Sequence, residues 1–248
     1  MMFSSVFKQV VPSVLCATLL SAAAQANVVL SGTRVIYDGA EREISVNARN
    51  PSTTPVLAQV WIDSGDAAER AESSRAPFWI TPPLIRIEAG GAQVFRVMEV
   101  PSTVPMPTDR ESVYYFNILD VPPRPLDAVE PSYMQFAYRT RVKLFYRPKG
   151  LPGSPAAAAK QLRWSLHPQQ DGTVAMEIVN PSAFHVSFNN VRVKVVDTFY
   201  DVDVAMTAPL STQRYNVDGL TMLPPIGSVQ FEWINDFGAT AQEVVPLR

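Results

Sequence analysis

Positively charged side chains alternate with apolar ones in one segment near the middle of the chain, residues 133–148. The charged members are Arg139, Arg141, Lys143 and Arg147. Alternate residues of a strand point to opposite faces, so the other face would be apolar or carry hydroxyl groups. That face comprises Met134, Phe136, Tyr138, Thr140 and Val142. The strand could pack inside a sandwich, or it could be an edge strand that offers side chains and backbone to another protein.

Residues that catalysis or metal binding usually requires are sparse. The chain has two histidines, His167 and His185, and neither has a second ligand at metal-binding spacing. No nucleophile elbow, P-loop or dinucleotide glycine fingerprint is present. An acidic stretch lacks the spacing of a calcium loop, so we expect a solvated turn there. It comprises Asp63, Asp66, Glu69 and Glu72. We therefore expect a protein that is not an enzyme, holds no metal and needs no cofactor.

The composition narrows the fold class and the partners. Of 248 residues, 47% are hydrophobic, which is enough for a packed core. There are 21 basic and 23 acidic residues, and this near balance argues against nucleic-acid binding. The 22 prolines argue against long helical bundles.

The first 26 residues have the features of a secretory signal peptide. Lys8 precedes a short apolar run that ends in Ala24-Gln25-Ala26. A retained membrane anchor is disfavoured because the run is shorter than the ~20 residues that a span needs. Lipidation at Cys16 is disfavoured by the bulky residue before it. Cleavage after Ala26 would remove the only cysteine, so the exported protein would have no disulfide, and we expect no membrane span in it.

The rest of the chain contains a repeated corner. Period-two apolar runs flank Asn50-Pro51 and Asn180-Pro181, and the apolar residues stand at matching offsets. They are Ile44, Val46, Ala48, Val56 and Ala58 in the first copy, and Val174, Met176, Ile178, Val186 and Phe188 in the second. No stretch shows a sustained helical period. We therefore expect a duplicated β-sandwich, with domains at 27–149 and 150–248 joined by a stiff connector rich in proline and glycine.

Several short motifs, in order along nearly the whole chain after residue 26, support a family assignment. They are residues 33–35, 58–62, 81–83, 109–112, 115–117, 143–148 and 234–238. Together they resemble the periplasmic pilus-assembly chaperones of the chaperone–usher pathway. The resemblance implies an all-β fold with two immunoglobulin-like β-sandwich domains in a boomerang arrangement. It also implies a periplasmic chaperone that binds pilus or fimbrial subunits by donor-strand complementation and delivers them to an outer-membrane usher.

The resemblance also implies roles for individual residues. Arg34 and Lys143 match paired cleft cations that anchor the subunit's terminal carboxylate. Met134, Phe136 and Tyr138 match donor-strand positions, although the last two are aromatic where the family commonly has aliphatic residues.

Two further groups are implied by the same resemblance. Glu111, Arg147 and Asp236 match a salt-bridge network between the domains. A more weakly supported group matches surfaces for the usher and the subunit. It consists of Leu57, Gln59, Thr81, Pro82 and Arg96.

Other functions remain open at this point. The main alternative is a secreted two-domain β-sandwich that acts as an adhesin or fibre subunit. Such a subunit would be expected to carry an N-terminal donor extension and an incomplete sandwich, and neither is clear here. A secreted hydrolase is remote, because no nucleophile–base pair is evident. A self-capping oligomer is also left open.

Overall fold

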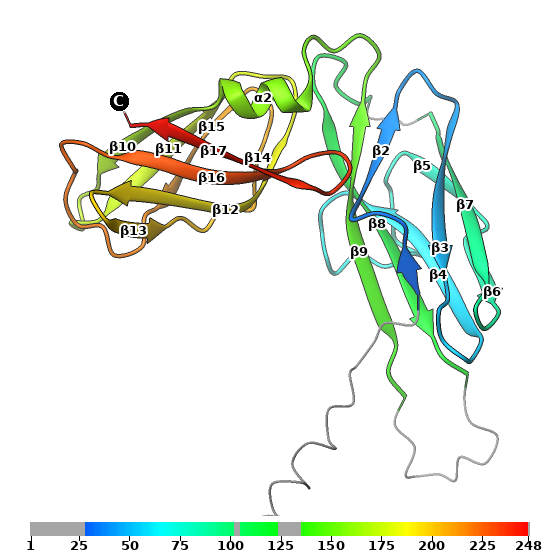
Figure 1. Ribbon diagram of the computed structural model, residues 1–248. Coiled ribbons are helices and arrows are strands. Elements are labelled where there is room, and N and C mark those ends of the chain that lie inside the picture. Colours follow the sequence, from blue (N-terminus) through cyan, green and yellow to red (C-terminus); the bar gives the residue numbers. More distant parts are fainter. Residues whose placement is uncertain (1–27, 102–104, 124–134, 248) are drawn as a thin grey trace, which may run out of the picture.

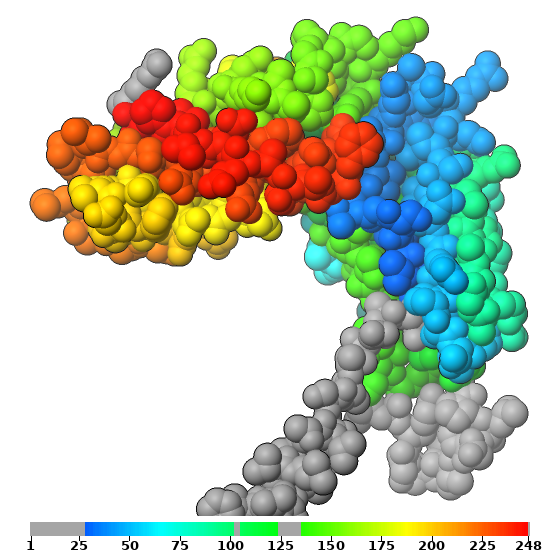
Figure 2. Space-filling view, viewed as in Figure 1, coloured from blue at the N-terminus to red at the C-terminus, as the bar shows by residue number. Residues whose placement is uncertain are grey.

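The computed structural model describes residues 28–101, 105–123 and 135–247. The expected signal peptide and Met134 lie outside these residues. Two β-sandwiches meet at one end and enclose an open angle (Figures 1 and 2). Within the described ranges, no helix is long and apolar enough to cross a membrane.

The N-terminal sandwich contains β1 to β9 (Figure 1). One sheet has the order β1 (Val29–Leu30), β3 (Glu43–Arg49), β7 (Ala92–Glu99) and β5 (Phe78–Thr81). The other has the order β2 (Arg34–Asp38), β9 (Tyr138–Arg147), β8 (Ser112–Val121), β4 (Val56–Asp63) and β6 (Leu84–Ile87). The two sheets bury a common core that includes Tyr37, Phe95, Phe116 and Leu144.

The C-terminal sandwich contains β10 to β17. One sheet has the order β10 (Arg163–Pro168), β11 (Val174–Asn180) and β15 (Ser211–Asn216). The other has the order β13 (Thr198–Asp201), β12 (Val186–Val195), β16 (Ser228–Ile234) and β17 (Thr240–Pro246), and β14 (Met206–Thr207) also pairs with β12. Trp164, Phe188 and Phe231 contact one another through tilted and edge-on rings in a separate core.

A helix that sequence reasoning missed follows the connector. Helix α2 (Pro155–Gln161) begins after Ser154, whose hydroxyl accepts the backbone N–H of Ala157. The local signals were an N-cap serine, a proline at the first helical position and a run of alanines. At seven residues the helix is too short to show a sustained helical period in the sequence.

The repeated corner has the same hydrogen bonds in both domains. Asn50 and Asn180 are fully buried. Each side-chain oxygen accepts the backbone N–H and the hydroxyl of the serine two residues later, Ser52 or Ser182. Each side-chain amide donates to the backbone carbonyl four residues later and to carbonyls of a neighbouring strand or loop. The sequence repeat therefore reflects a repeated structural device.

Strand β9 is shorter than the alternating pattern suggests. The pattern predicted a long strand over residues 133–148, whereas β9 begins at Tyr138. Phe136 precedes it and is 60% exposed. On one side β9 pairs with β8 along nearly its whole length, so the strand is held in the sheet without using its other edge.

The other edge of β9 is only half covered. Strand β2 runs parallel to β9 and pairs with it from Lys143 onward. Among the strands that the structure describes, none lies beside the part from Tyr138 to Val142. We call this part the open edge. Unpaired strand edges are the usual place where another chain adds a strand.

Candidate functional site

Two cations stand at the end of the open edge. Arg34 and Lys143 are partners in the parallel register of β2 and β9, so their side chains share one face. The Arg34 Nη1 atom donates to the carbonyl of Ile234 at 2.9 Å. The Lys143 Nζ atom lies 3.3 Å from the Ser187 hydroxyl oxygen. Both residues, which we call the cation pair, therefore face the C-terminal sandwich.

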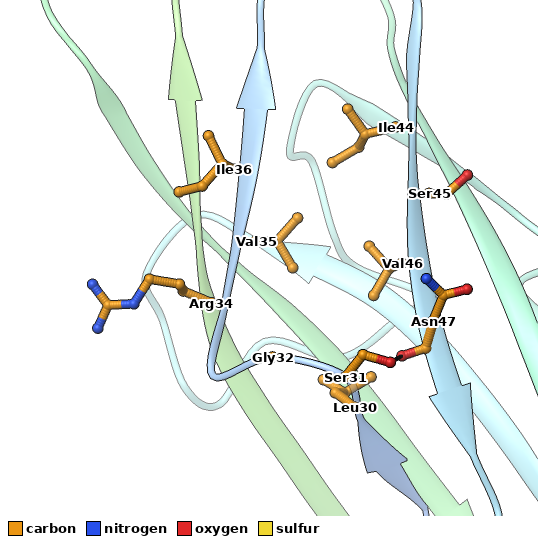
Figure 3. A pocket seen from close by; sticks show the side chains of 10 residues that line it. All are labelled: Leu30, Ser31, Gly32, Arg34, Val35, Ile36, Ile44, Ser45, Val46 and Asn47. Carbon is orange, nitrogen blue, oxygen red and sulfur yellow. Dashed lines mark hydrogen bonds between the residues drawn. The ribbon is translucent and has the colours of Figure 1, made fainter. Parts of the chain in front are cut away.

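Figure 3 shows how the backbone of β2 aims Arg34. Val35 points between β2 and β3 into a cavity of about 250 Å³, and Arg34 points away from it. The alternation of a strand thus gives Val35 to the core side and Arg34 to the space between the domains.

The electrostatics of the cation pair favour an anion. Burial lowers the pKa of Arg34, although the charges of Asp236 and Glu111 partly oppose this shift. Burial and the charge of Arg34 lower the pKa of Lys143. The Arg34 Nε atom is buried and has no hydrogen-bond partner within the described part of the chain. Neither cation forms an ion pair with another described residue. A bound carboxylate would supply a counter-ion for Lys143 and an acceptor for the Nε atom of Arg34.

The structure brings together the three residues expected to bridge the domains. Arg147 donates from Nε to Glu111 at 2.7 Å and from its two Nη atoms to Asp236 at 2.7 and 2.6 Å. Burial disfavours the charge of Arg147, but the two carboxylates outweigh it and raise its pKa. The arginine belongs to β9 and Asp236 to the turn after β16, so this contact joins the two sandwiches.

His185 is a member of this network that the sequence did not reveal. Its backbone N–H and its Nδ1 atom both lie within 2.9 Å of one Glu111 oxygen. The N–H of Glu111 in turn donates to the carbonyl of Ala183. The only sequence signal was its place close to the second Asn-Pro corner.

The expected solvated turn is wrong for Asp63, which is fully buried. Arg141 binds its two oxygens from Nε and Nη2 at 2.9 and 2.6 Å, and Arg139 and Asn117 add bonds at 3.3 and 2.8 Å. Although burial opposes ionisation, the hydrogen bonds from Arg141, Asn117 and the backbone N–H of Gly65 lower the pKa of Asp63. The carboxylate is therefore the internal counter-ion of two β9 arginines. Within the described residues, no group of acids, histidines or cysteines forms a metal site.

The same two arginines lie over aromatic rings. The guanidinium carbon of Arg139 is 4.7 Å from the ring centre of Trp61, and that of Arg141 is 3.5 Å from the ring centre of Tyr115. Cation–π contacts and the shared carboxylate occupy both side chains. Lys143 is therefore the residue of this basic row that remains without a counter-ion among the described residues.

The five residues expected at usher or subunit surfaces fall into two groups. Leu57 and Gln59 lie on β4, whereas Thr81 and Arg96 are cross-strand partners on β5 and β7 of the other sheet. Pro82 lies at the corner between the sheets, after a cis peptide bond. The structure therefore does not bring all five to one face.

Comparisons with known proteins cover nearly the whole chain. Residues 27–152 match the family described as "Pili and flagellar-assembly chaperone, PapD N-terminal domain". Residues 157–244 match "Pili assembly chaperone PapD, C-terminal domain".

Individual relatives agree with this match. The chain is 40% identical over 225 residues to the probable fimbrial chaperone YadV of Escherichia coli K12, covering 90% of each chain. It is 36% identical over 221 residues to the chaperone protein FimB/FhaD of Bordetella pertussis, covering 88% of this chain and 87% of the relative.

Solved structures extend the likeness to the fold. The crystal structure of the YadV chaperone has a TM-score of 0.77 and 36% identity, and the match covers 89% of this chain and all of that one. The Salmonella enterica SafB chaperone, solved with the SafA pilin, has a TM-score of 0.71 and 27% identity, covering 91% and 97% of the two chains. The predicted all-β fold of two immunoglobulin-like sandwiches is confirmed. The chain belongs to the family of pilus-assembly chaperones.

Proposed function

We propose that this protein is a periplasmic chaperone that caps pilus subunits by lending them a strand and then delivers them to an outer-membrane usher. Family membership supports the chaperone role, and a relative 27% identical has been solved with a pilin. Capture of this kind needs no catalysis and no cofactor, because subunit folding and later strand exchange supply the free energy. We place the signal peptide at residues 1–26 and the domains at 27–149 and 150–248.

The observation that carries the proposal is the relation of the open edge to the cation pair. Strand β2 is parallel to β9 and starts at Arg34, opposite Lys143. A strand added along Tyr138–Val142 and parallel to β9 would lie in line with β2 and end just before the first residue of β2. Its carboxyl end would then meet Arg34 and Lys143. The geometry thus suits a client strand that ends in a free carboxylate.

Apolar contacts would supply much of the affinity. Phe136 is largely exposed beside the open edge, and Tyr138 begins β9. Complete burial of one such side chain contributes about 1.5–3 kcal/mol. We propose that these two residues and Met134 fill the open groove of an incomplete subunit.

The usher contact is proposed on the side of the N-terminal sandwich that carries Leu57. An apolar cavity of about 300 Å³ adjoins this residue. It is lined by Pro55, Val56, Leu57, Arg86, Val121, Pro122 and Pro123. Gln59 lies on the same strand, and Thr81, Pro82 and Arg96 would extend the contact around the corner.

The test is to isolate the mature protein from its own periplasm and identify its partners by mass spectrometry. Lys143→Met is compared with wild type, and Lys149→Met, which changes an exposed lysine, is the matched control. We expect a small sandwich protein bound one to one by wild type and by the control, and absent from Lys143→Met. A partner retained by Lys143→Met, or no partner with wild type, would instead favour an adhesin or fibre subunit.

A further inference from the structure

One large aromatic side chain, on a turn whose neighbouring residues contact Thr33, Arg34 and Arg147, is almost completely exposed. Phe237 has 93% of its surface exposed, and it lies at the tip of the turn between β16 and β17. Single exposed apolar residues are common and need no explanation by themselves. Phe237 differs because of how firmly its turn is built and where the turn is placed.

The turn is held by its own hydrogen bonds. The Asn235 side-chain oxygen accepts the backbone N–H groups of Phe237 and Ala239, both at 3.0 Å. The N–H of Gly238 donates to the carbonyl of Asn235 at 3.0 Å, and the N–H of Asn235 donates to the carbonyl of Ala239 at 2.9 Å. A turn with these bonds presents its tip in a fixed orientation.

The turn is also fixed to the N-terminal sandwich on both sides of Phe237. Before it, Asp236 forms two bonds with Arg147. After it, Gly238 has φ +82° and packs so closely that a Cβ atom there would lie 2.5 Å from the Thr33 hydroxyl oxygen. Thr33 immediately precedes Arg34, and Arg34 itself bonds to Ile234 at the start of the turn. In Figures 1 and 2 the hairpin end of β16 and β17 reaches the N-terminal sandwich at the base of β2.

We propose that Phe237 is a further contact residue of the subunit-binding site, covering an apolar side chain near the carboxyl end of the captured strand. This inference rests on the proposed function. If the carboxylate of the client strand is fixed at Arg34 and Lys143, its last few residues follow one another at about 3.3 Å per residue and so lie close to the turn. Alternate side chains point to opposite faces, so one of the last two faces the C-terminal sandwich. We expect the client side chain that faces Phe237 to be apolar, because the phenyl ring has no polar group to offer it.

The proposed role of Phe237 differs from that of the cation pair. Arg34 and Lys143 would recognise a group that every chain end possesses, whereas the ring would distinguish one chain end from another. The C-terminal sandwich would thereby take part in selecting the client, although the strand pairs only with β9.

The test uses fluorescently labelled synthetic peptides that alternate valine and serine and end in a free carboxylate. Two peptides differ only in the apolar position nearest that end, which is phenylalanine or serine. Affinities are measured by anisotropy for wild type, Phe237→Ser, Lys143→Met and Ile226→Ser. The last removes a side chain of similar exposure, 82%, and serves as the matched control.

We expect Phe237→Ser to weaken the phenylalanine peptide about tenfold and the serine peptide hardly at all. Lys143→Met should weaken both peptides, and Ile226→Ser neither. Equal affinity of Phe237→Ser and wild type for the phenylalanine peptide, while Lys143→Met loses both, would overturn the role of Phe237 alone. A change only in self-association, followed by light scattering, would assign the ring to contact between two copies and overturn it too. If wild type bound neither peptide, or if Lys143→Met bound both as wild type does, the proposed function itself would fall.

Discussion

At the scale of single residues, the main feature is a lysine whose positive charge is disfavoured by its surroundings. Lys143 is partly buried beside Arg34, and its pKa is lowered by burial first and by the neighbouring charge second. Asp63 is the counter-ion of Arg139 and Arg141 and forms no described ion pair with Lys143. A protein gains no stability from such a residue, so a binding role explains its presence best.

The first prediction follows from this cost. Lys143→Met keeps the aliphatic stem but removes the charge, so the free protein should unfold at an equal or higher temperature while the capture of a carboxylate-ended peptide falls. We expect the affinity to drop about tenfold to a hundredfold, the usual range for one charge-assisted contact. Thermal unfolding and anisotropy would be measured on the same samples. Unfolding of the variant at a clearly lower temperature would show that Lys143 is structural.

The second prediction concerns pH. The folded-state pKa of Lys143 is below its usual 10.5, so the unfolded chain binds this proton more tightly than the folded protein. The residue therefore destabilises the fold at all pH values below its lowered pKa, and this effect disappears as the pH rises to about 10.5. Peptide binding has the opposite trend and should weaken as the pH rises through the lowered pKa.

The measurement is peptide affinity against pH for wild type and Lys143→Met. The fall should begin below pH 10.5 in wild type and be missing in the variant, which retains Arg34. The same fall in both proteins would assign the titration to another group.

At the scale of elements, each sandwich has a corner built around a buried asparagine. Asn180 uses its oxygen and its amide to satisfy backbone and hydroxyl groups on two segments of the chain, the corner at Ser182–Phe184 and Ala208. Asn50 does the same in the N-terminal sandwich. The sequence repeat predicted a turn, and the bonds show in addition that each asparagine side chain ties its corner to a segment about 30 to 40 residues further along the chain.

The third prediction is that Asn180→Ala destabilises the C-terminal sandwich by about 2–3 kcal/mol, because several buried polar groups lose their partners. Denaturant unfolding followed by tryptophan fluorescence would measure the loss, since Trp164 and Trp233 lie in this core. Asn189→Ala is the control, because Asn189 is exposed and bonds only to Glu232 among the described contacts. Equal effects of the two substitutions would contradict a structural role for the corner.

At the scale of the whole molecule, a few contacts join the two sandwiches, and we expect them to set the angle between them. Arg147 donates hydrogen bonds to Glu111 of its own sandwich and to Asp236 of the other. The backbone N–H of His185, in the C-terminal sandwich, also donates to Glu111. Buried ion pairs of this kind add little net stability but do specify geometry. The angle matters because it brings the Phe237 turn and the Ile234 carbonyl next to the cation pair.

The fourth prediction is that Asp236→Asn loosens this angle without unfolding either sandwich. The amide keeps the shape but loses the charge, and Arg147 keeps Glu111 as a partner. We expect a broader distribution of interdomain distances by small-angle scattering, a nearly unchanged unfolding temperature and weaker peptide binding. Asp171→Asn is the control, because it makes the same chemical change on an exposed turn away from the contact between the domains. An unchanged scattering profile would show that other contacts set the angle.

The sequence by itself determined the β class and the duplicated corner, which follow from local alternation and from turn chemistry. Short motifs in fixed order, through the family resemblance, pointed to the cation pair and to the Glu111–Arg147–Asp236 set, whose roles stay predictions. The sequence overestimated the length of β9 and missed helix α2, because alternation continues past the end of strand pairing and seven residues are too few for a helical period.

Only the tertiary structure decided which charges are neutralised and which side chains meet across the domains. Asp63 was expected in solvent but lies under two arginines that follow it by more than 70 positions in the chain. His185 and Phe237 acquire their places only when β9, β12 and the turn after β16 come together. Burial and partners are properties of distant segments brought into contact, so local patterns could not contain them.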